Sequence, residues 1–176
     1  MKNKKIEKII IALTAAFVII SVFLVFGGNV FSGGEDIRKT DSSVMPEATG
    51  TTNEIKKKTV VEQDFICTSD TISNLGIVFS RLAYIDDINL TIELLNGKKV
   101  LASKTINIGK IEDQHRTFID PTSKLSGMKS KKLTIRIYPS TEEDTGLVIM
   151  MDKNAKASFR FGSKTIKGTL CFSVNE

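Results

Sequence analysis

The stretch INLTIELLNGKKVLASKTI, residues 88–106, carries the strongest signal for the fold. Its first half places an apolar residue at every second position, with Asn89, Thr91 and Glu93 between them. This alternation is typical of a strand that buries one face. The dipeptide Asn96-Gly97 follows, and it is a strong hairpin signal because both central residues of such a turn need a positive φ. We therefore predict a β-hairpin whose return strand covers residues 99–106.

The same period of two recurs on both sides of this hairpin. Further strands are expected at residues 61–67, 76–81, 116–119, 133–138, 147–152, 157–161 and 170–174. Glycines and Pro139 separate these segments, and no long amphipathic helix pattern occurs among them. About eight or nine short strands in about 115 residues are typical of an antiparallel β-sandwich, here expected to be jelly-roll-like. The folded domain is assigned to residues 60–176.

A different pattern precedes this domain. Residues 9–26 read IIIALTAAFVIISVFLVF, and no charged residue occurs between residues 9 and 34. Eighteen helical residues at about 1.5 Å each extend about 27 Å, close to the thickness of a bilayer core. We predict one transmembrane α-helix over residues 9–31, which makes the lipid bilayer a partner. A cleaved signal peptide is the alternative, although its apolar region is usually shorter.

Flanking charge predicts the orientation of this helix. Residues 1–8 contain four lysines and one glutamate, and form the expected cytoplasmic tail. The protein is therefore expected in the cell membrane as a single-pass protein with an extracytoplasmic C-terminal domain. Residues 32–59 are rich in Gly, Ser, Thr and charged residues, so a flexible linker is expected there.

The charge distribution argues against a nucleic-acid partner. The chain has 176 residues and a net charge of +5, but residues 60–176 contain 16 basic and 14 acidic residues. A nucleic-acid-binding domain usually concentrates its basic residues in a stripe or patch, and the sequence of this domain suggests none. A chain of this length accommodates one domain with appendages.

Residues 62–152 resemble the small extracytoplasmic β-sandwich modules of bacterial membrane proteins, several of which are linked to cell-surface polysaccharide assembly. The resemblance is carried by short motifs in this order: Phe65, Asp70-Thr71-Ile72, Leu75-Gly76-Ile77, Leu90–Leu94 with Asn96-Gly97, Ile111-Glu112-Asp113, Lys131–Ile135 and Thr145-Gly146. It implies a membrane-attached β-sandwich at the cell envelope and supplies no catalytic residues.

Two cysteines, Cys67 and Cys171, fall on the first and last expected strands. A disulfide between them would persist outside the cytoplasm. The alternation argues against it, because Cys67 shares a face with Phe65 whereas Cys171 lies opposite the apolar face of its strand. Two separate thiols are therefore the favoured prediction, and the disulfide is the alternative.

Cys171 and His115 also raise the hypothesis of a sortase-like cysteine transpeptidase. Sortases are membrane-anchored envelope enzymes with a Cys, an upstream His and a downstream Arg. Here Leu170 occupies the position where their signature has Thr, and no Arg follows Cys171. A thiolate nucleophile needs a cationic partner. These departures favour a protein without catalytic function.

Aromatic residues suggest a ligand face instead. The chain has no Trp, and its two tyrosines are Tyr84 and Tyr138. Tyr138 shares a strand face with Arg136, and the two could hold a sugar by stacking and hydrogen bonding. The candidate ligand face is therefore Tyr84, Arg136 and Tyr138. No cofactor or metal is expected, since the acidic run 142–144 is typical of a solvated loop.

Together these patterns favour a non-catalytic, membrane-anchored binding or assembly module, with a carbohydrate or a neighbouring membrane protein as partner and a role in cell-surface glycan synthesis. The alternatives are the sortase-like transpeptidase and a purely structural envelope protein.

Overall fold

The computed structural model describes residues 40–41, 45–140 and 143–175. Residues 40–176 form one compact unit. All the described residues of the hydrophobic core, from Ile55 to Val174, belong to this unit. The described residues include no helix that is long and apolar enough to cross a membrane. The expected cytoplasmic tail and transmembrane helix, residues 1–31, lie outside the described residues.

The described part of the chain is mainly β, and all the strand pairs within it are antiparallel. A six-stranded sheet has the order β11-β10-β3-β8-β5-β6. Its strands are β3 (Val61–Ile66), β5 (Asn89–Asn96), β6 (Lys99–Asn107), β8 (Lys132–Pro139), β10 (Ser158–Phe161) and β11 (Lys164–Lys167).

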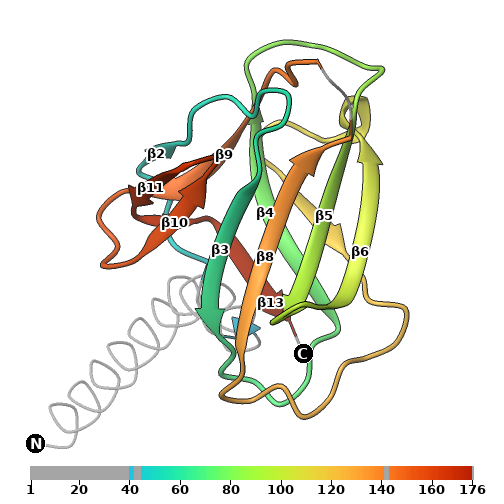
Figure 1. Ribbon diagram of the computed structural model, residues 1–176, viewed down its shortest axis with the longest axis vertical. Helices are drawn as coiled ribbons and strands as arrows, with labels where there is room; N and C mark the ends of the chain where they lie inside the picture. The colour runs from blue at the N-terminus through green and yellow to red at the C-terminus, as the bar shows by residue number, and fades with distance from the viewer. Residues whose placement is uncertain (1–39, 42–44, 141–142, 176) are drawn as a thin grey trace, which may run out of the picture. The chain divides into compact units, whose positions relative to one another are not determined.

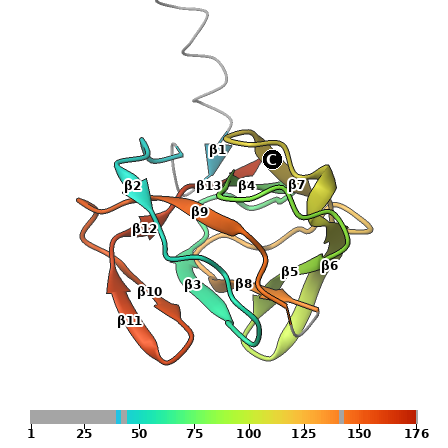
Figure 2. The same ribbon diagram turned by 90° about the horizontal axis from the view of Figure 1, so that it is seen from above.

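The second sheet has seven strands in the order β1-β13-β4-β9-β12, with β2 beside β9 and β7 beside β4. These strands are β1 (Thr40–Asp41), β2 (Gly50–Thr51), β4 (Asn74–Arg81), β7 (Arg116–Ile119), β9 (Leu147–Asp152), β12 (Thr169–Leu170) and β13 (Phe172–Asn175). The short 3-10 helix η2 (Ile108–Lys110) follows β6. Figures 1 and 2 show the sheets as two layers, an arrangement compatible with the predicted β-sandwich.

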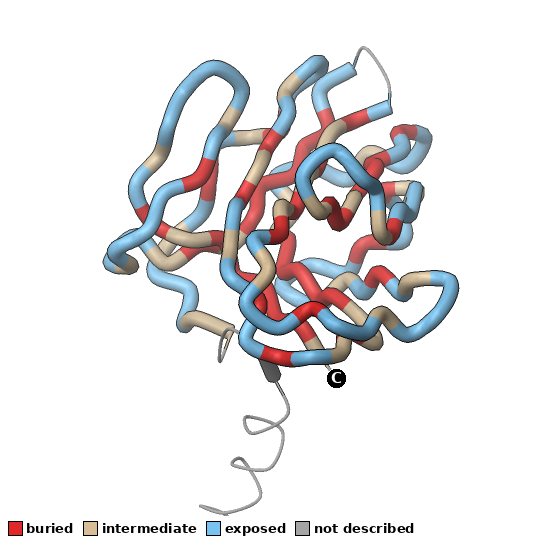
Figure 3. The backbone as a smooth tube through the Cα atoms, turned by 60° about the horizontal axis from the view of Figure 1, so that its bottom comes forward, coloured by how far each residue is buried: buried red, intermediate tan, exposed pale blue. Residues whose placement is uncertain are grey.

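The apolar alternation determines which side chains lie between the layers. Along β8, Leu133, Ile135 and Ile137 are fully buried, while the residues between them are partly exposed. Leu90, Ile92 and Leu94 on β5 are buried too, but so are Thr91 and Leu95. In Figure 3 the buried positions run through the middle of the molecule and most loops are exposed. The half-buried strand predicted for residues 133–138 is confirmed, whereas the strand predicted from residue 88 forms but is buried on more than one face.

The predicted hairpin at residues 88–106 is also confirmed, but its turn lies one residue later than expected. Asn96 pairs with Lys99, so Gly97 and Lys98 are the central residues. Gly97 has φ +59° and Asn96 does not have a positive φ. A register irregularity between Leu94 and Leu95 accompanies this shift.

The predicted flexible linker over residues 32–59 is wrong for residues 45–59. Ile55 is 0% exposed, and its backbone N–H donates to the Leu147 carbonyl at 2.8 Å. Thr145 Oγ1 in turn donates to the Ile55 carbonyl at 2.6 Å. The buried Ile55, the pairing of β2 with β9 and further backbone hydrogen bonds hold this polar segment along β9. We call residues 49–55 the N-terminal strap.

The C-terminal segment also differs from its prediction of one half-buried strand. It divides at Cys171, where the Cys171 N–H donates to the Met150 carbonyl and the Cys171 carbonyl accepts from Val78 N–H. The chain thereby changes its pairing partner from β9 to β4. All residues from Leu170 to Val174 are buried, because the outer side of this segment is covered as well. Strand β11, which was not predicted, forms a hairpin with β10 through Gly162 at φ +58°.

Candidate functional site

A row of charged side chains crosses the outer face of the six-stranded sheet. Arg160 on β10 lies opposite Glu62 on β3, Glu62 lies opposite Arg136 on β8, and Arg136 lies opposite Glu93 on β5. All four residues point outward from the sheet, because the residues next to them in each strand face the core. We call these four residues the charged row.

Hydrogen bonds join the members of the charged row. Arg136 Nε donates to Glu62 Oε1 at 2.6 Å, and its Nη1 donates to Glu93 Oε2 at 3.5 Å. Arg160 forms an ion pair with the other oxygen of Glu62. The carboxylate side chains are largely buried, at 10% and 13% exposure for Glu62 and Glu93, whereas that of Arg136 is 37% exposed.

Tyr138 adjoins the row one outward position further along β8. Its hydroxyl donates to Glu93 Oε1 at 3.2 Å. Burial and the nearby Glu93 carboxylate raise the pKa of Tyr138 above its ordinary value of 10.0. The phenol therefore remains neutral at physiological pH, with its hydroxyl directed to the row.

An open groove of about 740 Å³ lies over the charged row. Its walls are Val60, Glu62, Glu93, Arg136, Tyr138, Arg160, Gly162 and Ser163. Both arginines are only partly buried, so their guanidinium groups can donate to a molecule in the groove. This arrangement suits a polar ligand that offers several hydroxyl groups.

Two of the three residues predicted as a ligand face, Arg136 and Tyr138, therefore lie together in this groove. The third, Tyr84, does not line it and belongs to the loop after β4. Its side chain is 86% exposed, and the Arg81 guanidinium lies 4.7 Å from its ring centre. Strand alternation could identify the first two as neighbours, whereas nothing in the sequence could place a loop residue.

The other members of the row, Glu62, Glu93 and Arg160, were not predicted as site residues. Each is the polar member of an alternating strand, which is a signal for an outward position but not for a shared site. They meet only through the strand order β10-β3-β8-β5.

The two cysteines are buried and are not joined by a disulfide bond. Cys171 Sγ donates to the Pro46 carbonyl at 3.4 Å, and Cys67 Sγ donates to the Ser69 carbonyl at 3.3 Å. Burial, with a smaller contribution from Asp152, raises the pKa of Cys171 to about 11. A thiolate nucleophile requires the opposite shift.

His115, the second residue of the sortase-like hypothesis, lies in the segment before β7. It is exposed, and its Nδ1 lies 2.8 Å from the Asp113 carbonyl oxygen. Asp144, in the acidic run 142–144, forms an ion pair with Lys56 at 3.4 Å. Within the ranges the structure describes, no group of three or more His, Cys, Asp or Glu residues could hold a metal ion.

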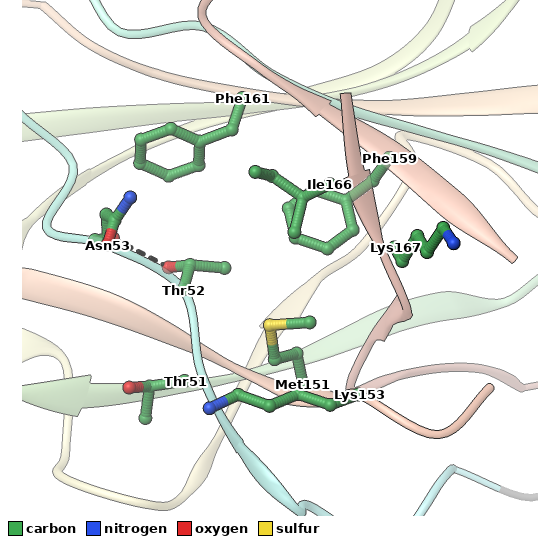
Figure 4. Close-up of a pocket in the computed structure, with 9 residues that line it drawn as sticks. All are labelled: Thr51, Thr52, Asn53, Met151, Lys153, Phe159, Phe161, Ile166 and Lys167. Atoms are coloured by element: carbon green, nitrogen blue, oxygen red, sulfur yellow. Dashed lines mark hydrogen bonds between the residues drawn. The ribbon is translucent and has the colours of Figure 1, made fainter. Parts of the chain in front are cut away.

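A second hollow, of about 380 Å³, lies between the N-terminal strap and the β10–β11 hairpin (Figure 4). Met151, Phe159, Phe161 and Ile166 give it an apolar lining, and Lys153 and Lys167 also contribute to its wall. Sequence patterns did not predict this hollow, because residues 51–53 were expected in a linker. The sequence matches no protein-family model and no curated protein.

Proposed function

We propose that this protein is a non-catalytic binding module that holds a glycan in the groove over the charged row. The observation that carries the proposal is the set of four cross-strand partners, two guanidinium groups and two carboxylates, beside Tyr138. Sugars present closely spaced hydroxyls that both donate and accept hydrogen bonds. Paired arginine and carboxylate groups offer complementary donors and acceptors on a rigid support.

The shape of the groove favours a chain-like ligand. It is open and runs over the sheet rather than into the core, so its occupant lies across several strands. Tyr138 supplies an aromatic ring that can stack on the apolar face of a sugar. An extended polysaccharide segment meets both requirements.

The proposal includes the setting expected from the sequence. The basic N-terminus and the apolar span 9–31 support a single-pass protein whose jelly-roll-like β-sandwich lies outside the cytoplasm. A binding module held at the membrane surface would retain or guide a growing glycan, alone or beside a neighbouring membrane protein. The proposed role is therefore in cell-surface glycan assembly.

Calorimetric titration with fractionated envelope polysaccharides tests the binding proposal. Tyr138→Ala and Arg160→Gln each remove one groove contact at a position that is not fully buried. Each is expected to weaken binding at least about fivefold, the effect of losing about 1 kcal/mol. Lys132→Gln is the matched control, because Lys132 lies on the outer face of β8 and does not line the groove. Equal binding by all variants, or binding of no polysaccharide, would refute the proposal.

Protease treatment of intact cells tests the setting separately. The C-terminal domain of the full chain is expected to be digested from the outside once any outer wall barrier is removed. Full protection under those conditions would contradict the orientation without bearing on the groove.

A further inference from the structure

The hollow beneath the β10–β11 hairpin is a second site, separate from the charged row. The wall residues come from the N-terminal strap, from the end of β9 and the turn after it, and from both strands of the hairpin. None of them lines the groove over the charged row. Figure 4 shows the side chains of Thr52 and Asn53 on one side of the hollow and those of Ile166 and Phe159 on the other.

The floor of this hollow is apolar for a structural reason. Phe159 and Ile166 are cross-strand partners in the hairpin, and they project on the same side of it. Met151 completes the floor from β9. Gly168, with φ +118°, leaves room for the Met151 methyl group, since a Cβ at Gly168 would lie 2.7 Å from Met151 Cε. The hollow's volume of about 380 Å³ falls within the usual range of small-molecule sites.

The charge at its edge is positive. Lys153 lies across β2, because a Cβ on Gly50 would be 2.3 Å from its Cε and 2.6 Å from its Nζ. In Figure 4 its ammonium lies on the Thr51 side of the hollow. Lys167 adds a second positive charge to the wall. Within the described ranges, neither lysine forms an ion pair.

We propose that this hollow binds a small anionic amphiphile. Its apolar chain lies against Met151, Phe159 and Ile166, and its carboxylate or phosphate pairs with the Lys153 ammonium. Burial of the chain contributes most of the affinity, since each buried methylene is worth about 0.8 kcal/mol. The ammonium determines the sign of charge that the site accepts.

Calorimetry on residues 40–176 tests this proposal, because that unit contains every core residue that the structure describes and omits the apolar span that would itself bind amphiphiles. Four ten-carbon probes distinguish the chemistry: decanoate, decyl phosphate, decanol and decyltrimethylammonium. The two anions are expected to bind at least about fivefold more tightly than the alcohol, and the cation more weakly still. Their relative affinities show whether the site prefers a carboxylate or a phosphate.

Variants locate the binding. Lys153→Gln is expected to weaken anion binding about fivefold without changing decanol binding, while Lys156→Gln, which alters a nearby lysine outside the hollow, changes neither. Gly50→Ala displaces the Lys153 side chain and retains its charge, so it should reproduce the loss. Ile166→Gln should weaken all the probes that bind.

Three outcomes would overturn the proposal. The first is a cation that binds as tightly as decanoate. The second is anion binding that survives Lys153→Gln, Gly50→Ala and Ile166→Gln in folded protein, as judged by circular dichroism. The third is that none of the four probes binds. None of these results affects the groove, which uses other residues.

Discussion

Arg136 on β8 and Glu62 on β3 are joined by a hydrogen bond of 2.6 Å from Nε to Oε1 across the outer face of the sheet. The second oxygen of the same carboxylate faces Arg160 on β10. The largely buried Glu62 carboxylate therefore pairs with one guanidinium group from each neighbouring strand. Its removal leaves two guanidinium groups and the single carboxylate of Glu93 in place of a balanced set of four charges.

The first prediction concerns this shared carboxylate. Glu62→Ala is expected to lower the free energy of unfolding by about 1–2 kcal/mol, because Arg136 loses its shortest hydrogen bond and faces Arg160 without the intervening charge. Glu62→Gln should lose less, since its amide oxygen can still accept from Arg136. Urea unfolding followed by circular dichroism measures both. Equal stability of wild type and Glu62→Ala would contradict the prediction.

The second prediction concerns the N-terminal strap. Ile55→Ala is expected to lower the free energy of unfolding by about 2–4 kcal/mol, because it empties a fully buried site between the strap and the core. Ile66→Ala is the matched control at a side chain that is 56% exposed, and should cost less than about 1 kcal/mol. If both variants unfold at the same urea concentration, the strap does not contribute to the core.

The third prediction concerns the Cys171 thiol. With a pKa of about 11, only about one thiol in a thousand is ionised at pH 8. Native protein carrying Cys67→Ala should therefore react with iodoacetamide at least about a hundredfold more slowly than the same variant in denaturant. Labelling followed by mass spectrometry measures both rates. Rapid labelling of the folded protein would show that Cys171 is accessible and acidic.

The fourth prediction concerns stability in acid. Hydrogen bonds from Lys132 and Thr134 lower the pKa of Asp64 below its ordinary value of 3.8, and bonds from the Arg81 N–H and Ser80 hydroxyl do the same for Asp113. The unfolded chain therefore binds more protons than the folded one in this range, so stability rises with pH there. The contribution of these two carboxylates to stability should be fully present above about pH 5. It should be lost as the pH falls through 3.8 toward their lowered pKa values in the folded state.

The variant Asp64→Asn tests this sign. It should be less stable than wild type at pH 7, and the difference should shrink between pH 5 and pH 3. Asp87→Asn, in an exposed loop, serves as the control and should follow the wild-type curve. A difference that grows as the pH falls would mean that the folded-state pKa of Asp64 is raised rather than lowered.

Local pattern was sufficient for most of the strands. Leu133, Ile135, Ile137 and the polar residues between them define one buried and one outward face, because successive side chains of a strand point to opposite sides. The same rule placed Arg136 and Tyr138 together. The rule failed at Ser173, which the alternation predicts as outward but which is fully buried. A strand's own sequence does not show whether another part of the chain covers its outer face.

The sequence by itself determined most of the strands, the hairpin and the shared face of Arg136 and Tyr138, since these depend on residues a few positions apart. Only the tertiary structure decided that Ile55 belongs to the core and that the strap and hairpin enclose a hollow. It also brought Glu62 to Arg136, which lies 74 positions away in the chain. Such contacts depend on strand order and register, which arise when the whole core is buried at once and which no short stretch of sequence specifies.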